Sequence, residues 1–390
     1  MAASSVVSTT KTKQNLSDPL GLFSLLSPDL VLEILYGLPV KSLLTLKCVS
    51  KPLNSLISDP KFSKDHLRLS QTRHNNLLVC PYFNFKDLEF VFDSRLPSIF
   101  NNFTSTISET KLYFPIDNCY NVSLVDSCDG IICFKTTDYY NRHVRLVIWN
   151  PCTRNFKVLS LYENPPSLTS KTSYSFGYDH FTNSYRVVVV FCYQLNKSCK
   201  TLVKVSTLGN DFWRTIPDFP SQIMGQPERH PGKFVSGTIN WVILDRENDS
   251  SRVILSLDLG NESYQEILQP NYGLDEPLHN FSLGVYRDYL CVLAHTKSFL
   301  DIWVMKDFGN KESWTKLFIV PFAEFLDYYG YSRLGYTRLL YISEEDDQVV
   351  LDFYNKIYVY NYKNRISKIP EIHGFTRFTS NVYAESLISP

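Results

Sequence analysis

A short pattern recurs five times in the second half of the chain, and its spacing constrains the fold more than any other feature. Each copy has a large apolar residue, two variable residues, and then Leu or Ile. Neighbouring copies begin roughly 50 residues apart. Each follows an apolar run and a turn, which is the pattern of two antiparallel strands. The copies begin at Phe156, Trp213, Tyr264, Trp314 and Ile366.

Another apolar run lies near a glycine further upstream in each unit, as in Gly130–Cys133 and Gly237–Val242. A period near 50 residues, with about four strands per unit, is typical of a kelch-type β-propeller. The competing architecture, a β-sandwich, does not require a fixed spacing between its strands. We therefore expect an all-β propeller.

Strand-like segments remain at both ends of this region. Residues 76–92 precede the first clear unit, and Val382–Ile388 follows the last. Because proteins avoid leaving strand edges unpaired, we expect these two segments to pair in a composite blade that closes the ring. The sequence thus predicts a six-bladed, kelch-like propeller.

The chain ahead of the strands carries the start and stop signals of short helices. Ser27 can cap a first helix with Pro28 at its first position, and Pro39 then forces a break. Ser50 can cap a third helix, which Asp59 and the proline after it end while starting a further turn. We expect a small all-α domain of three to four helices.

The change from helical to strand-like texture divides the chain into three parts. We expect a disordered tail over residues 1–22, the helical domain over 23–70 and the propeller over 71–390. The polar segment from Ser70 to Asn76 is expected to be a linker.

The helical segment holds more Leu, Ile and Val than short helices can bury among themselves. Domains near or below roughly 40 residues seldom fold without a partner, a metal or a disulfide. The surplus apolar surface suggests a docking patch. The alternative, in which the helices belong to a larger core, is equally compatible with the periodicity alone.

Three stretches of this segment, residues 26–44, 47–51 and 55–62, resemble a plant F-box. The resemblance implies docking onto a Skp-type adaptor and, through it, onto a cullin–RING ubiquitin ligase. The chain departs from the family in the displaced Pro28 and in Leu53, which stands where the family has Trp. Losing an aromatic anchor weakens the implied contact. The implied adaptor-binding residues are Pro28, Leu30, Val31, Ile34, Leu35, Leu38, Pro39, Val40, Leu43, Leu46, Cys48, Val49, Leu53 and Ile57.

The strand-rich part resembles the F-box-associated domain of plant F-box proteins, which include the S-locus F-box group. The resemblance rests on Trp149-Asn150-Pro151, Phe176–Asp179, Trp303–Gly309, Ser313–Lys316 and Tyr383–Leu387. It implies a non-catalytic subunit that recruits a target protein for ubiquitination. It does not identify the target, because these families share a framework and differ in surface loops.

Composition excludes several other classes of function. The 390-residue chain has 39 basic and 39 acidic residues, which argues against nucleic acid as a partner. No apolar run approaches about 18 residues, so no membrane span is expected. Nine cysteines without a CxxC motif suggest buried free thiols and a reducing cytoplasmic or nuclear setting. From Lys41 to Arg73, seven basic residues face two acidic ones, which can steer an acidic partner.

The sequence contains none of the motifs HExxH, GxSxG and GxxxxGK[ST], and its eight histidines are dispersed. We therefore expect no catalytic residue, metal or cofactor. The acidic run Glu344–Asp347 is expected to be a solvated hairpin tip rather than a cation site. Tyr139, Tyr140 and Arg142 lie in a long excursion and are weak candidates for target binding.

Three functions remain open at this level. The first is the substrate-recognition subunit of an SCF-type (Skp–cullin–F-box) ligase. The second is a ligase-independent binding module whose F-box is weakened by Leu53. The third is an enzyme, which would need His, Asp or Glu side chains to converge at the mouth of the propeller channel.

Overall fold

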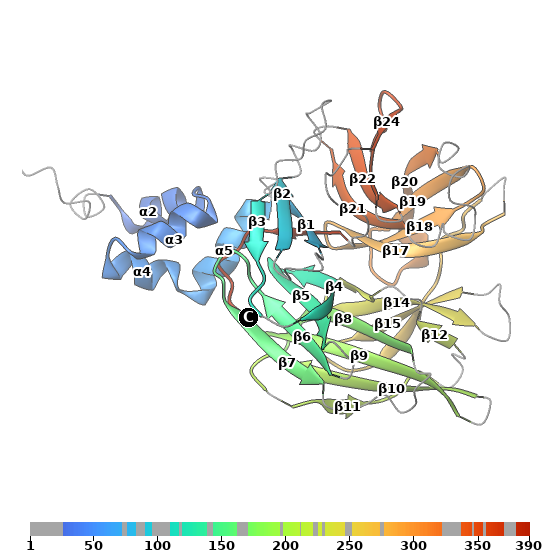
Figure 1. The fold of residues 1–390 in the computed structure, drawn as a ribbon. Coiled ribbons are helices and arrows are strands. Elements are labelled where there is room, and N and C mark those ends of the chain that lie inside the picture. Colours follow the sequence, from blue (N-terminus) through green and yellow to red (C-terminus); the bar gives the residue numbers. More distant parts are fainter. Residues whose placement is uncertain are drawn as a thin grey trace, which may run out of the picture.

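The computed structural model consists of a helical unit standing at one side of a ring of β-sheets (Figure 1). The predicted tail, residues 1–22, lies outside the part of the chain that the structure describes. The described residues are 26–71, 76–82, 90–95, 110–116, 119–138, 143–161, 171–195, 198–210, 212–220, 225–227, 231–245, 252–273, 277–321, 337–344, 347–353, 356–369 and 380–390.

Four helices form the N-terminal unit, and the predicted caps are confirmed. The Ser27 hydroxyl accepts from the Leu30 N–H at 3.4 Å, and the Ser50 hydroxyl accepts from the Leu53 N–H at 3.3 Å. These bonds satisfy donors that the first turn of each helix leaves free. The helices are α2 (Pro28–Tyr36), α3 (Val40–Lys47), α4 (Lys51–Ile57) and α5 (Pro60–Gln71).

Helix α5 is longer than the sequence indicated. A single further turn and a polar linker from Ser70 were expected, whereas the helix continues to Gln71. Its mean hydropathy is low, yet Phe62, His66 and Leu67 are buried on one face. Packing along that face stabilises the helix, although its polar composition did not predict a helix of this length.

Five sheets are each built from one continuous stretch of chain with antiparallel neighbours. A short 3₁₀ helix, η1 (Lys311–Ser313), precedes β20. The strands are β4 (Tyr120–Cys128), β5 (Ile131–Thr137), β6 (Val144–Trp149) and β7 (Phe156–Leu161); β8 (Lys171–Asp179), β9 (Ser184–Leu195), β10 (Ser198–Thr207) and β11 (Arg214–Ile216); β12 (Gly225–Pro227), β13 (Lys233–Val235), β14 (Thr238–Asp245), β15 (Arg252–Asp258) and β16 (Tyr264–Ile267); β17 (Asn280–Tyr286), β18 (Tyr289–His295), β19 (Phe299–Met305) and β20 (Trp314–Pro321); and β21 (Thr337–Ser343), β22 (Gln348–Phe353), β23 (Lys356–Asn361) and β24 (Ile366–Lys368).

The recurring sequence pattern corresponds to the outermost strand of each of these sheets, namely β7, β11, β16, β20 and β24. The apolar runs before the pattern are the neighbouring strands β6, β10, β15, β19 and β23. The predicted pairing of each run with its pattern across a tight turn is confirmed. The repeat in the sequence therefore corresponds to the two outer strands of each of these sheets.

A further sheet is composite, because its strands come from both ends of the ring-forming chain. The C-terminal strand β25 (Asn381–Ala384) pairs with β1 (Asn76–Tyr82), which continues into β2 (Phe90–Arg95) and β3 (Thr110–Tyr113). In this pairing Ala384 lies opposite Asn76. The predicted pairing of the two end segments is confirmed.

One inner strand of each sheet contacts an inner strand of the next sheet around the ring. Strand β4 contacts β8, β8 contacts β13, and β13 contacts β17. Beyond these, β17 contacts β21, β21 contacts β25, and β25 contacts β4. The composite sheet therefore fills the position between the last and the first of the continuous sheets.

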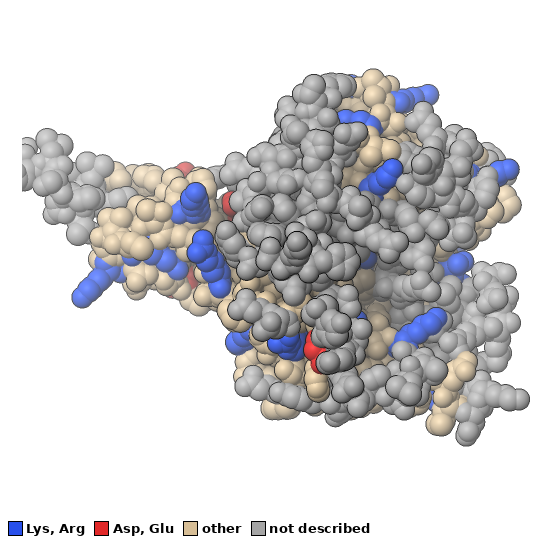
Figure 2. All heavy atoms as spheres, viewed as in Figure 1, with Lys and Arg blue, Asp and Glu red and all other residues tan. Residues whose placement is uncertain are grey.

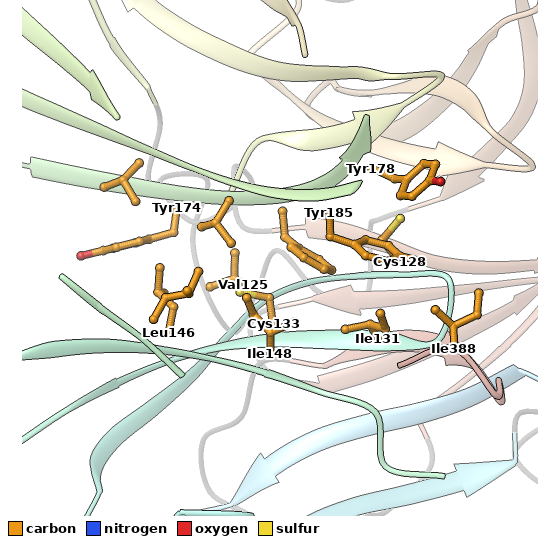
Figure 3. Close-up of a cluster of buried hydrophobic side chains, with 14 of the residues drawn as sticks. Val125, Cys128, Ile131, Cys133, Leu146, Ile148, Tyr174, Tyr178, Tyr185 and Ile388 are labelled. Carbon is orange, nitrogen blue, oxygen red and sulfur yellow. The ribbon is translucent and has the colours of Figure 1, made fainter. Parts of the chain in front are cut away.

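The core lies between neighbouring sheets, and the central strands are apolar on both faces. In β9, Val187 and Val189 pack towards the sheet β4–β7, whereas Val188 and Val190 pack towards the sheet β12–β16. Figure 3 shows the first of these layers, which also includes Ile388 from the C-terminus. A strand buried on both faces loses the apolar–polar alternation of a surface strand.

Contacts with the helices define one face of the ring. The turn between β8 and β9 carries Asn183, which is hydrogen-bonded to Lys64 of α5, and the turn between β6 and β7 carries Cys152, which packs against the helices. We call this the helix-side face. Because successive strands are antiparallel, the connections between second and third strands lie on the opposite face.

Candidate functional site

The helical unit leaves four large apolar side chains in solvent among the described residues. Leu30, Ile34 and Val49 are 49%, 46% and 46% exposed, and Leu69 on α5 is 37% exposed. Leu30 and Ile34 lie one turn apart on α2, so their side chains share one side of that helix. Of the other predicted adaptor-binding residues, Val31, Leu38 and Leu46 are half-buried, and Pro28, Pro39 and Cys48 are exposed. We call Leu30, Ile34 and Val49 the exposed apolar face.

Five of the predicted adaptor-binding residues lie instead in the core of the helical unit: Leu35, Val40, Leu43, Leu53 and Ile57. Their side chains are not available to a partner in this conformation. Periodicity could not separate them from the exposed residues, because both sides of these short helices are apolar. A polar substitution at Leu35 would disrupt the fold of the helices rather than report on docking.

Leu53 has a structural role that the sequence did not reveal. Its side chain is only 6% exposed and packs with the other core leucines. In this conformation the side chain faces inward, and an effect of Leu53 on adaptor binding stays a prediction.

The helical unit also carries exposed basic residues. Lys41, Lys51 and Lys61 are exposed on α3, α4 and α5, and Figure 2 shows lysine and arginine side chains over the helical unit. Partial burial lowers the pKa of Lys47 below its ordinary value. A helical unit with exposed apolar and basic side chains suits an acidic partner with apolar anchors.

Helix α5 belongs to both parts of the molecule. Phe62 lies in the helical core and stacks on Tyr36 with ring centroids 4.9 Å apart. Nε2 of His66 lies 2.8 Å from the Leu38 carbonyl oxygen, within the helical unit. One turn after Phe62, Leu67 packs into the ring cluster that contains Phe176. Because Phe62 and Leu67 enter two different cores, α5 packs against both the helical unit and the ring.

A polar contact also connects α5 to the ring. Nζ of Lys64 donates to the Tyr178 hydroxyl and to Oδ1 of Asn183, both at 2.7 Å, and it lies 5.0 Å from the centroid of the Tyr178 ring. Below it, the Tyr185 hydroxyl donates to Asp129 at 2.9 Å. Burial raises the pKa of Asp129, and the bond from Tyr185 partly offsets that rise.

The C-terminal residues form the third connection. Nδ2 of Asn150 donates to the backbone oxygens of Ser386 and Ile388 at 3.0 and 2.6 Å. Gly130 has a φ of +78°, and a Cβ there would lie 2.4 Å from the Ser386 hydroxyl oxygen. Asn150 and Ser386 belong to two of the motifs quoted above, but sequence alone did not show that they meet.

A buried ionic network links the sheets β8–β11 and β12–β16 on the helix-side face. The guanidinium of Arg186 is 2.7 Å from Asp179 and 3.1 Å from Glu262, which Arg214 also contacts. Hydrogen bonds from Thr182 and the Phe181 N–H, together with Arg186, hold the pKa of Asp179 below 3.8, although burial opposes this. Asp179 therefore has a structural role in this network.

Arg186→Met is expected to destabilise the protein by about 3–5 kcal/mol at neutral pH, because it leaves the buried carboxylate of Asp179 without its cation, whereas Glu262 keeps Arg214. The lowered pKa of Asp179 means that its stabilising contribution is present above about pH 4 and is lost as pH falls. The gap in melting temperature between the variant and the wild type should therefore narrow below pH 4. Calorimetric scans from pH 3 to pH 7 check both effects, and an equal gap at every pH would contradict them.

No three His, Cys, Asp or Glu side chains in the described residues are arranged to hold a metal ion. Of the acidic run 344–347, Glu344 pairs with Arg287 at 2.9 Å and Asp347 with Lys363 at 3.2 Å. Full burial lowers the pKa of His295 to about 3, so this histidine stays neutral at physiological pH. No helix of the described chain is both long and apolar enough to cross a membrane.

Tyr139, Tyr140 and Arg142 lie outside the described residues. The described residues that flank them, Thr137 at the end of β5 and Val144 at the start of β6, pair with each other.

The helices and the ring correspond to two known protein families. Residues 23–71 match the F-box domain, and residues 63–390 match the F-box associated beta propeller domain. The second match covers most of the chain, so the protein belongs to the F-box proteins that carry this propeller.

Its relatives include plant proteins of the same architecture. The chain is 28% identical over 367 residues to the F-box/kelch-repeat protein At3g23880 of Arabidopsis thaliana, with 93% of this chain and 95% of the relative covered. It is 25% identical to F-box protein CPR1 of the same plant, with 84% and 79% covered. A chain from the crystal structure of the nidogen/laminin complex is similar at 10% identity and a TM-score of 0.46, with 80% and 99% covered.

Proposed function

We propose that this chain is the substrate-recognition subunit of an SCF-type E3 ubiquitin ligase. Its helices would dock a Skp-type adaptor, and through it a cullin–RING ligase, while the ring recruits a target protein. The observation that carries the proposal is the exposed apolar face, Leu30, Ile34 and Val49, on a unit whose other side is fixed to the ring. Large apolar side chains left in solvent, such as Leu30 and Ile34 on one side of α2, are typical of protein-binding sites.

Such a subunit acts by proximity. Holding target lysines near a charged ubiquitin carrier turns a bimolecular encounter into an effectively intramolecular one. A geometry of this kind requires a stiff connection between docking unit and recruiting unit. Helix α5, the Lys64 contact and the C-terminal residues supply three such connections.

The composite sheet acts, in this proposal, as a sixth blade that closes the propeller. A closed ring has no free inner edge and presents its connections at two faces. The helices occupy part of the helix-side face, so we assign target recruitment to the opposite face. Tyr139, Tyr140 and Arg142, which follow β5 in the sequence, remain the candidate contacts.

The proposed setting is the cytoplasm or the nucleus. The cysteines whose side chains the structure describes are all free, as a reducing compartment requires. The ligase-independent alternative rested on Leu53, and the burial of that side chain in the helical core removes the observation in its favour.

The proposal is tested by titrating a purified Skp-type adaptor into the full-length chain in a calorimeter. We expect saturable one-to-one binding with a favourable heat. Because burial of apolar surface gives a negative heat-capacity change, the binding enthalpy should become more negative as the temperature rises. Absence of binding at concentrations in the tens of micromolar would contradict the proposal.

A further inference from the structure

Among the described residues, the core of the helical unit contains one fully packed side chain from the C-terminal end of the chain. Leu387 lies three residues before Pro390, is 4% exposed, and packs in the cluster of Leu35, Leu43 and Ile57. It is separated from those residues by the whole propeller sequence. The last residues of the chain thus complete the core of the first domain.

The ring determines where Leu387 lies. Ala384 is fixed by the pairing of β25 with β1. Beyond it, Ser386 and Ile388 are bound through their backbone oxygens by Asn150, and the Ile388 side chain packs between two sheets of the ring (Figure 3). Leu387 is held between these two residues and has its side chain in the helical core instead.

The hydrophobic core that the helices form by themselves is small. Helices α2, α3 and α4 have nine, eight and seven residues. Helices this short are marginal in water and depend on tertiary packing. Removing a fully buried leucine leaves a cavity that a small core fills only partly. The helical unit is therefore sensitive to the presence of Leu387.

We infer that Leu387 couples closure of the ring to the docking competence of the helices. The helices are synthesised first, but their packing is completed only when the C-terminal strand has paired and its last residues have been seated. A chain with an open or truncated ring would then present a loosened docking unit. Leu387 is a positioning residue in this coupling, since its own side chain does not contact a partner.

The coupling is measured by hydrogen exchange of the full-length chain, which requires no adaptor. In Leu387→Ala, exchange of the amides of α2, α3 and α4 should quicken at least tenfold, whereas amides in the central strands β5 and β9 should keep their protection. Leu387→Met should restore slow exchange, because it fills the same space without branching. Unchanged exchange in the helices of Leu387→Ala would overturn the inference.

The matched control is Leu351→Ala, which removes a buried leucine from the sheet β21–β24, where it packs with Leu293 and Ile302 rather than with the helices. It should speed exchange in its own sheet and leave the helices unchanged. If helix exchange quickens as much in the control as in Leu387→Ala, the effect is general destabilisation and the coupling is refuted.

The expected effect on adaptor binding rests on the proposed function and is measured in a separate experiment. Adaptor affinity should fall in Leu387→Ala, return in Leu387→Met and stay at the wild-type value in Leu351→Ala. If the wild-type chain binds no adaptor, the proposed function fails, while the exchange data still decide the coupling. If the wild type binds and Leu387→Ala binds equally well, the docking part of the inference fails.

Discussion

Deletion of residues 380–390 is expected to lower the melting temperature of the whole protein by roughly 10 °C or more. The deletion removes β25 from the composite sheet together with the buried side chains of Tyr383, Leu387 and Ile388. Burial of large apolar side chains is worth about 1.5–3 kcal/mol each, so the loss is on the order of 5 kcal/mol or more. In a domain of this size, each kcal/mol shifts the melting temperature by about 2 °C or slightly more.

Differential scanning calorimetry of the full-length and truncated proteins measures this loss. A shorter deletion of Ser389 and Pro390 is the control, because it keeps β25, Asn150 and the seated residues 386–388. The control should melt within about 2 °C of the wild type. An unchanged melting temperature after deletion of 380–390 would falsify closure of the ring by the C-terminal strand.

The double variant Leu30→Asp/Ile34→Asp is expected to weaken adaptor binding at least roughly 30-fold, which corresponds to the 2 kcal/mol of a typical hot spot. Both side chains are about half exposed in the free protein, so their replacement should leave the fold intact. In the complex, each aspartate would bring a charge into an apolar contact. Titration calorimetry measures the affinity, and circular dichroism checks the helices.

Ile319→Asp is the matched control for this variant. Ile319 is 50% exposed on β20, an outer strand far from the helices, so the chemical change is the same at a different place. The control should bind the adaptor with wild-type affinity. If the double variant also binds undiminished, the docking face lies elsewhere on the molecule.

The architecture of the ring could be predicted from the sequence because its signals are local and repeated. Each copy of the pattern, such as Tyr264–Ile267, marks an outer strand after a tight turn, and five copies make a chance match improbable. The composite pairing followed from a general rule, since the segments at residues 76–82 and 381–384 were otherwise left with unpaired edges.

The candidate site could be predicted only in part, since the sequence located the helices but not their orientation. Leu30 and Leu35 look equivalent in a short amphipathic helix, yet one is exposed and the other fully buried. The difference depends on where α5 and Leu387 pack, and Leu387 comes from the far end of the chain. No local periodicity contains that information.

The contacts between the helical unit and the ring could not be predicted for a related reason. Lys64 lies in a polar stretch of α5 and meets Tyr178 and Asn183 only after more than one hundred intervening residues have folded. A lysine in such a stretch predicts only a solvated helix face. Contacts of this kind arise from tertiary packing and have no signature in a single sequence.

The central claim is that one chain joins a ligase adaptor to a recruiting ring, and the most direct test is to mix the full-length protein with purified Skp-type adaptor and cullin–RING subunits. Size-exclusion chromatography with light scattering then reports the mass of each species. The account predicts a single complex containing one copy of the chain, formed only when the adaptor is present and lost in Leu30→Asp/Ile34→Asp. Elution of the chain alone from the complete mixture would contradict it.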